Sequence, residues 1–260
     1  MTHAVPAIAI LFSAAFAAAI PAAAAVAAAA EPSDDTIPTA DGAVALHAIH
    51  HAAFTLTWKG LTILVDPAPP FGGTPPADVT AEYRALPQPG LILLTHDHPD
   101  HFNVPILEAV SGGAEIVAPK EVYDAMPADL QAKTRVMTNG EAATVAGVPI
   151  QAVAMYNTTP DRLKYHPPGG GNGYVLTIGA KRIYIAGDTE ETPEMKGLKD
   201  IDVAFLPMNL PYTMDIEHAA QAVKDFRPKV VYPYHSRGSD MAKFKTLVGD
   251  AGDVRLLKWY

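Results

Sequence analysis

The stretch that decides the fold is Leu91-Ile92-Leu93-Leu94-Thr95-His96-Asp97-His98-Pro99-Asp100-His101. Its first four residues form an uninterrupted apolar run, which is typical of a buried strand. Three imidazoles and two carboxylates follow within six residues, where the chain is expected to turn. Imidazole nitrogen and carboxylate oxygen are common zinc ligands, so this turn is a candidate metal site. The competing interpretation is a solvated histidine-rich loop, but such a loop does not require a hydrophobic strand leading into it.

This turn resembles the second of the short metal-site motifs of the metallo-β-lactamase superfamily, and the resemblance extends from about residue 43 to residue 260. It implies an α/β fold, the αββα four-layer sandwich, in which two mixed β-sheets pack face to face with helices on the outer faces. It also implies two metal ions. His96 and His98 would bind the first metal, and Asp100 and His101 the second.

The remaining motifs of the superfamily fall on four other residues. The resemblance makes Asp66 an acceptor that orients a ligand imidazole, and makes Asp188 a bridge between both metals. His166 is the only histidine between His101 and Asp188, so it is the candidate third ligand of the first metal. His235 would complete the second. The alternatives are an ordinary turn aspartate at Asp66 and Asp188, a solvated loop histidine at His166, and a histidine at the edge of the core at His235.

Two further residues match segments of related hydrolases. His51 lies in a His-His-Ala segment that resembles a Gly-His-Ala turn near the site, which implies that His51 lines the site outside the ligand set. Tyr212 matches a Tyr-Thr-Met segment, which implies a hydrogen bond to the developing oxyanion; packing at the start of a helix is the alternative. We expect His47 and His218 to be structural or exposed.

The resemblance implies a dinuclear metal-dependent hydrolase, similar to ascorbate-phosphate lactonases and N-acylphosphatidylethanolamine phospholipases. Two divalent ions would hold a bridging hydroxide that attacks an ester, a lactone or a phosphodiester in a small-molecule or lipid-like substrate. Asp100, Asp188 and Tyr212 are the catalytic candidates. We expect Zn²⁺, although Mn²⁺ or Fe²⁺ suits the same ligands. The alternatives are a β-lactamase, which generally lacks an aspartate equivalent to Asp188, and a non-catalytic metal-binding protein of the same fold.

Composition limits the function classes. The chain of 260 residues contains no Cys, so disulfides and thiolate ligands are excluded. The formal net charge is −9, and an acidic surface repels phosphate backbones. We therefore expect no nucleic-acid partner, and a nuclease is disfavoured.

The first thirty residues contain no Lys, Arg, Asp or Glu and end in an alanine tract. This pattern predicts a signal peptide over residues 1–30, and hence a periplasmic or secreted protein with no membrane span after cleavage. An uncleaved membrane anchor is the alternative. We expect a polar linker over residues 31–42 and one hydrolase domain over residues 43–260. Residues 44–54, 55–58 and 61–65 have the composition of short strands.

Overall fold

The computed structural model describes residues 1–3, 33–71 and 78–260, so nearly all of the predicted signal peptide lies outside the described residues. The described chain forms two sheets of seven strands each. The first sheet contains β1 (Asp34–Ile37), β2 (Val44–His50), β3 (Ala53–Trp58), β4 (Leu61–Val65), β5 (Leu91–Leu93), β6 (Glu115–Ala118) and β7 (Thr134–Val136). The second contains β8 (Ala142–Val145), β9 (Val148–Ala154), β10 (Asn172–Ile178), β11 (Lys181–Ile185), β12 (Val203–Pro207), β13 (Val230–Tyr234) and β14 (Asp253–Val254).

The two sheets have the same internal order. β1 to β4 pair antiparallel and β4 to β7 pair parallel. In the second sheet, β8 to β11 pair antiparallel and β11 to β14 pair parallel. Strands β2, β4 and β5 therefore run in one direction, as do β9, β11, β12 and β13. Their carboxyl ends collect at one edge of each sheet, and the loops that leave these edges carry the candidate site.

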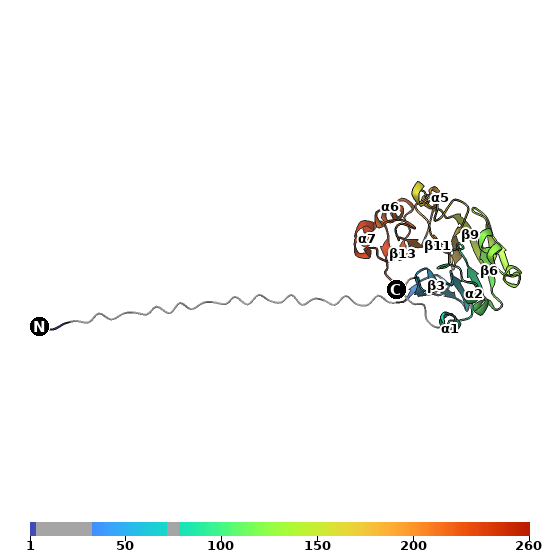
Figure 1. Ribbon diagram of the computed structural model, residues 1–260, viewed down its shortest axis with the longest axis horizontal. Helices are drawn as coiled ribbons and strands as arrows, with labels where there is room; N and C mark the ends of the chain where they lie inside the picture. The colour runs from blue at the N-terminus through green and yellow to red at the C-terminus, as the bar shows by residue number, and fades with distance from the viewer. Residues whose placement is uncertain (4–32, 72–77) are drawn as a thin grey trace. The chain divides into compact units, whose positions relative to one another are not determined.

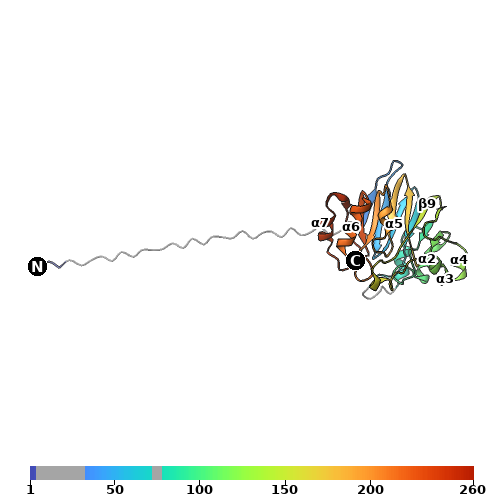
Figure 2. The same ribbon diagram turned by 90° about the horizontal axis from the view of Figure 1, so that it is seen from above.

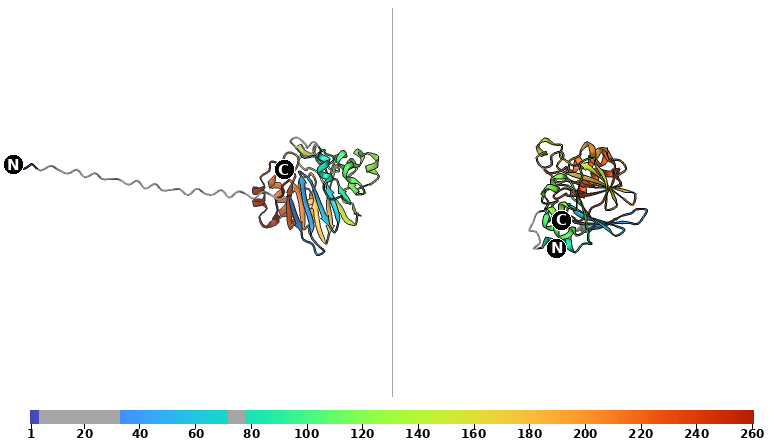
Figure 3. Two further views of the ribbon diagram at one scale, coloured as in Figure 1. Left: turned by 90° about the horizontal axis from the view of Figure 1, so that it is seen from below. Right: turned by 90° about the vertical axis from the view of Figure 1, so that its right-hand side faces the viewer.

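The core lies between the inner faces of the two sheets. Its side chains come from both sheets, and Phe54 of β3 stacks on Phe205 of β12 with ring centroids 4.3 Å apart. Figures 2 and 3 show the strands of the two sheets running in similar directions. This face-to-face arrangement confirms the predicted sandwich, because each sheet buries its apolar inner face against the other.

Helices cover the outer faces of both sheets (Figure 1). The helices are α1 (Val79–Arg84), α2 (Val104–Ser111), α3 (Lys120–Ala125), α4 (Ala128–Gln131), α5 (Pro193–Gly197), α6 (Ile216–Phe226) and α7 (Met241–Val248), with short 3₁₀ turns at Pro160–Arg162 and Gly249–Ala251. Helix α6 begins after Asp215, whose side chain accepts a hydrogen bond from the main chain of His218, as expected of a capping aspartate. Among the described residues, no helix combines the length and apolarity needed to cross a membrane.

Two local expectations are corrected. The segment 31–42, expected to be a linker, contains β1, which pairs antiparallel with β2 at the edge of the first sheet. An edge strand can be polar because only one of its long sides pairs with another strand. The expected strand over residues 44–54 is interrupted by a turn at His51 and Ala52. That turn brings His51 to the candidate site.

Candidate metal centre

The segments that form the site leave their strands through left-handed turns. His51 follows β2 with φ 51°, Asp66 follows β4 with φ 43°, and His235 follows β13 with φ 42°. Gly187 has φ 66° shortly after β11. The left-handed region is uncommon for residues other than glycine and costs on the order of 1–3 kcal/mol each. Left-handed turns thus occur where several strands deliver polar side chains to one place.

Three of the predicted ligands form a first group. The ring centroids of His96 and His98 are 4.7 Å apart, and those of His98 and His166 are 4.8 Å apart. His98 Nδ1 lies 3.2 Å from His166 Nε2. One nitrogen from each of the three rings lies within 4.8 Å of the others, so this group could hold one cation.

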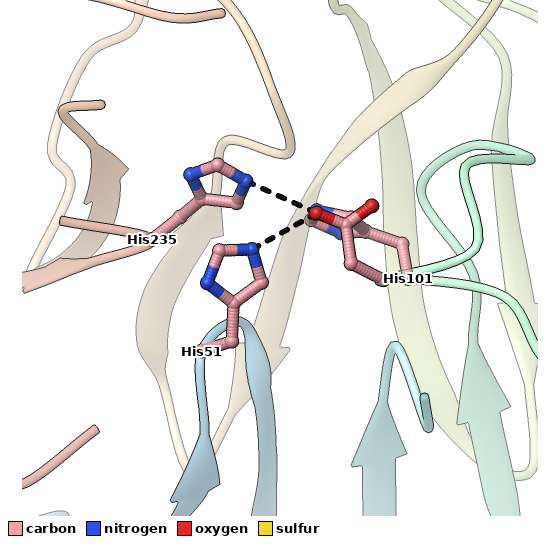
Figure 4. A group of neighbouring side chains, drawn as sticks. His51, His101 and His235 are labelled. Atoms are coloured by element: carbon pink, nitrogen blue, oxygen red, sulfur yellow. Dashed lines mark hydrogen bonds and ion pairs between the residues drawn. The ribbon is translucent and has the colours of Figure 1, made fainter. Parts of the chain in front are cut away.

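A second group contains the other predicted ligands Asp100, His101 and His235, together with His51. Asp100 Oδ2 lies 3.8 Å from His235 Nε2 and 3.1 Å from His51 Nε2. Figure 4 shows the rings of His51, His101 and His235 directed toward one another from three separate segments. The structure therefore places His51 as close to this group as a ligand would be.

Asp188 lies between the two groups. Its Oδ1 is 3.3 Å from His101 Nε2, and its Oδ2 is 3.0 Å from His235 Nε2. The same Oδ2 is 3.5 Å from His166 Nε2. One carboxylate thus contacts histidines of both groups, and the glycine before it, Gly187, donates its N–H to the hydroxyl of Tyr234 on β13.

Buried acceptors turn three of the imidazoles so that Nε2 is left free. His101 Nδ1 donates to Asp66 Oδ2 at 2.9 Å, and His166 Nδ1 donates to the carbonyl of Tyr212 at 3.1 Å. His96 Nδ1 lies 3.0 Å from the hydroxyl of Thr95, which itself donates to Asp66 and therefore accepts from His96. Fixing Nδ1–H in this way leaves the Nε2 lone pair as the available ligand atom.

Atoms in this centre fit a cation rather than further protein partners. Within the described part of the chain, His96 Nε2, His101 Nε2 and Asp188 Oδ1 are buried without any hydrogen-bond partner. Leaving buried acceptors unsatisfied is costly. A divalent cation would satisfy all three, since zinc takes imidazole nitrogen and carboxylate oxygen at about 2.0–2.2 Å.

Protonation equilibria show how the charges interact when no cation is bound. Burial would lower the pKa of His101, but the carboxylates of Asp188 and Asp66 outweigh burial and raise it. Burial would raise the pKa of Asp188, but His235 and His101 lower it. Burial lowers the pKa of His96 and lowers that of His51 to about 4. The metal-free centre therefore combines imidazoles that burial keeps neutral, His96 and His51, with a histidine, His101, whose protonated form is stabilised by the neighbouring carboxylates.

Tyr212 contacts the site through its main chain. Its carbonyl accepts hydrogen bonds from His166 Nδ1 and from Asn157 Nδ2, at 3.1 and 2.7 Å. Its ring packs edge-on against Tyr165 with centroids 5.0 Å apart and is partly exposed. The oxyanion role of its hydroxyl stays a prediction.

Two residues that contact the site were not found from the sequence. Glu190 accepts hydrogen bonds from the loop that leads to His166, and Tyr260 bonds to His51. Glu190 comes directly after the motif that contains Asp188 but is not part of it. Tyr260 is separated from His51 by more than 200 residues. Neither position carried a sequence signal. His47 and His218 were expected to be structural or exposed, and within the described ranges the side chain of each bonds to an aspartate, Asp34 and Asp215 respectively, at the surface.

Comparison with known proteins agrees with the fold described above. A family model described as "Beta-lactamase superfamily domain" matches residues 45–235. A UPF0173 metal-dependent hydrolase from Thermococcus onnurineus is 33% identical over 224 residues, covering 83% of this chain and 96% of the relative. The structure of a metal-dependent hydrolase from Parabacteroides distasonis is 39% identical with a TM-score of 0.76, covering 86% of this chain and 99% of that one. Igni18, a metallo hydrolase from Ignicoccus hospitalis, is 28% identical with a TM-score of 0.68, covering 83% and 95%.

Proposed function

The chain belongs to the β-lactamase superfamily, and we propose that it is a dinuclear hydrolase that cleaves esters, lactones or phosphodiesters. Its relatives are metal-dependent hydrolases. The dinuclear assignment is our own and is supported by two groups of ligand atoms with one carboxylate between them. We assign His96, His98 and His166 to the first metal, Asp100, His101 and His235 to the second, and Asp188 to both.

A pair of divalent cations, for which Zn²⁺ is our assignment, would lower the pKa of a bound water and polarise the oxygen of the attacked group. The protein orients the ligands for this task. Asp66, fully buried, holds His101 through Nδ1, and the carbonyl of Tyr212 holds His166 in the same way. Because both acceptors are fixed by the fold, the ligand atoms need little rearrangement when the site is loaded.

Asp100 is the residue we assign to proton transfer. Its side chain is 15% exposed, compared with 3% for Asp188 and none for Asp66. His51 and His235 both approach Oδ2 of Asp100, so Oδ1 is the atom we assign to receive the proton from the attacking water and to return it to the leaving group.

Exposed apolar side chains near the centre support a substrate with an apolar portion. Phe71 stacks on His51 with centroids 4.9 Å apart, and Tyr212 and Leu210 lie in the segment whose carbonyl holds His166. Apolar surface exposed beside a site indicates ligand contact. Together with the net charge of −9, this favours a small-molecule or lipid-like substrate over a nucleic acid.

The experiment is metal analysis combined with a hydrolysis screen of zinc-loaded protein. We expect close to two zinc ions per chain, loss of at least one in His101→Ala, and loss of turnover in Asp188→Ala with the fold retained. His218→Ala, which removes an exposed histidine bonded only to Asp215, is the control and should keep both metals. The screen covers lactones, phosphodiesters, thioesters and β-lactams. Full turnover in Asp188→Ala would contradict the proposal, and turnover of β-lactams alone would replace our substrate assignment.

A further inference from the structure

Among the residues that the structure describes, the hydroxyl of Tyr260 has three hydrogen-bonding neighbours, and together they determine where its hydrogen points. The main-chain N–H groups of Ser236 and Arg237 donate to it at 3.0 and 3.1 Å. His51 Nδ1 lies 3.0 Å away. A phenol oxygen has one hydrogen to donate, and its acceptor capacity is used here by two groups that can only donate. The Tyr260 hydrogen must therefore be donated to His51 Nδ1.

This assignment determines the tautomer of His51. A neutral imidazole that accepts at Nδ1 carries its hydrogen on Nε2. His51 Nε2 lies 3.1 Å from Asp100 Oδ2, so the N–H donates to that carboxylate. The three histidines His96, His101 and His166 show the opposite pattern, because each donates from Nδ1 and leaves Nε2 free.

We propose that Tyr260 and His51 form a relay that positions Asp100, and that His51 is not itself a metal ligand. The inference rests on the proposed function, because Asp100 is taken there as a ligand of the second metal. The relay fixes the Oδ2 side of Asp100 and thereby directs the carboxylate toward His101 and His235.

Main-chain contacts make the relay rigid. His51 N–H donates to the carbonyl of Trp259 at 2.9 Å, and the N–H of His235 donates to the carbonyl of His51 at 3.0 Å. The imidazole lies between His235 and Phe71, with ring centroids 3.9 and 4.9 Å away. The side chain is buried. His51 thus ties the β2 turn to the segment that carries the ligand His235.

Counting donors argues against ligation by His51. Ligation through Nε2 would require the hydrogen on Nδ1. That N–H would become a third donor to the Tyr260 oxygen, and the Tyr260 hydrogen would lose its acceptor. The proximity of His51 to Asp100, His101 and His235 therefore reflects support of a ligand rather than membership of the ligand set.

The tautomer of His51 is measured first, by ¹⁵N NMR of the histidine side chains in the full chain, with His51→Gln used to assign the signal. We expect hydrogen on Nε2, and a measured hydrogen on Nδ1 would overturn the relay. This measurement does not depend on how many metals bind, so it separates failure of the relay from failure of the dinuclear proposal.

Zinc affinity, measured by chelator competition, tests the consequence. Loss of a supporting partner typically weakens metal binding about 10–100-fold. We expect such a decrease for one zinc in Tyr260→Phe and His51→Met. His51→Gln should remain within a few-fold of wild type, since its amide can donate to Asp100. Tyr123→Phe is the control for loss of a hydroxyl and should bind zinc as wild type does.

A double variant distinguishes the relay from a general structural role. If Tyr260 acts through His51, Tyr260→Phe should weaken zinc binding less in the His51→Met background than in wild type; the remaining loss reflects the N–H groups of Ser236 and Arg237, which still bond to the hydroxyl. Fully additive losses would show that Tyr260 acts independently and would overturn the relay. If His51→Gln lost one zinc ion completely, as we expect for His101→Ala, His51 would be a metal ligand and the relay proposal would be overturned.

Discussion

Replacing Glu190 with alanine should release the loop that carries His166. Glu190 is 4% exposed and follows Asp188, the proposed bridging residue, by two positions. Its carboxylate accepts hydrogen bonds from the N–H and hydroxyl of Thr158, the N–H and hydroxyl of Thr159, and Nη1 of Arg162, at 2.6–3.0 Å. One buried carboxylate therefore organises the segment that leads to His166, a proposed ligand of the first metal.

The loss of stability expected for Glu190→Ala can be estimated from these hydrogen bonds. Hydrogen bonds to a charged group contribute about 1.5–3 kcal/mol each, so simple addition over the five donors would equal the stability of a whole domain and must be an overestimate. Water can reach some donors after the substitution, because the Arg162 side chain is 22% exposed. Breaking a buried ion pair from one side costs about 3–5 kcal/mol, and we expect Glu190→Ala to destabilise the metal-free protein by about this amount.

The pH dependence of this contribution has a defined sign. Burial would raise the pKa of Glu190, but hydrogen bonds from Thr159 and Thr158 outweigh burial and lower it. The unfolded chain therefore binds a proton more readily than the folded one. The stabilisation is complete above the pKa of an unfolded glutamate and is lost as the pH falls through the folded pKa.

The assays are urea denaturation of the metal-free protein and chelator competition for zinc. Glu190→Ala should lower the free energy of unfolding and weaken one zinc about 10–100-fold, because His166 loses its fixed position. Glu191→Ala is the matched control: Glu191 pairs with the partly exposed Lys196 at 3.4 Å, and its loss should cost less than about 1 kcal/mol. A Glu190→Ala protein as stable and as tightly zinc-bound as Glu191→Ala would refute the reasoning.

Three further predictions concern support of the centre. Asp66→Ala removes the acceptor of His101 and should weaken zinc binding about 10–100-fold in chelator competition; unchanged affinity would contradict its role. Gly187→Ala makes a Cβ clash with Met155 Sδ at φ 66° and should lower the free energy of unfolding by about 1–3 kcal/mol, whereas Gly197→Ala, with nothing within 4 Å, is the control and should unfold as wild type does. Burial lowers the pKa of His50 to about 4. The neutral form of His50 therefore contributes up to about 3 kcal/mol of stability above pH 6.5, and this contribution is lost as the pH falls toward 4. His50→Gln should reduce the slope of the free energy of unfolding against pH between these two values, and an unchanged slope would exclude the effect.

The sequence was sufficient to predict the sandwich and the candidate ligands for a physical reason. Most candidates closely follow an apolar strand, as His96 does after Leu91–Leu93 and His235 does after Val230–Tyr234, whereas His166 lies in the loop before β10. Parallel strands of one sheet end at the same edge, so residues that follow them are brought together by topology alone. The sandwich and the candidate ligands were inferred from the resemblance to the superfamily, and the apolar strands give the physical reason why residues that follow them lie close together.

The supporting contacts could not be predicted in this way. The relay from Tyr260 through His51 to Asp100 joins residues 209 and 49 positions apart, and no local pattern specifies such pairings. The turn at His51 was indicated only by the resemblance to a Gly-His-Ala segment, since a left-handed φ is usually signalled by glycine and histidine occupies this position. The polar strand β1 lacks the apolar alternation that would reveal it, because it pairs on the edge of its sheet.

Proton and cation binding at this centre are coupled by the same atoms. Without a cation, the carboxylate of Asp188 lies beside His101 and His235. Burial would lower the pKa of each histidine, but the charge of Asp188 outweighs burial and raises it. The site therefore retains protons on imidazoles whose Nε2 atoms face Asp188. A cation needs those nitrogens unprotonated, so its binding must release protons. Acid thus competes directly with the metal at His101 and His235, whereas His96, whose pKa burial lowers, offers its nitrogen without that competition. The first group should consequently keep its metal to lower pH than the second.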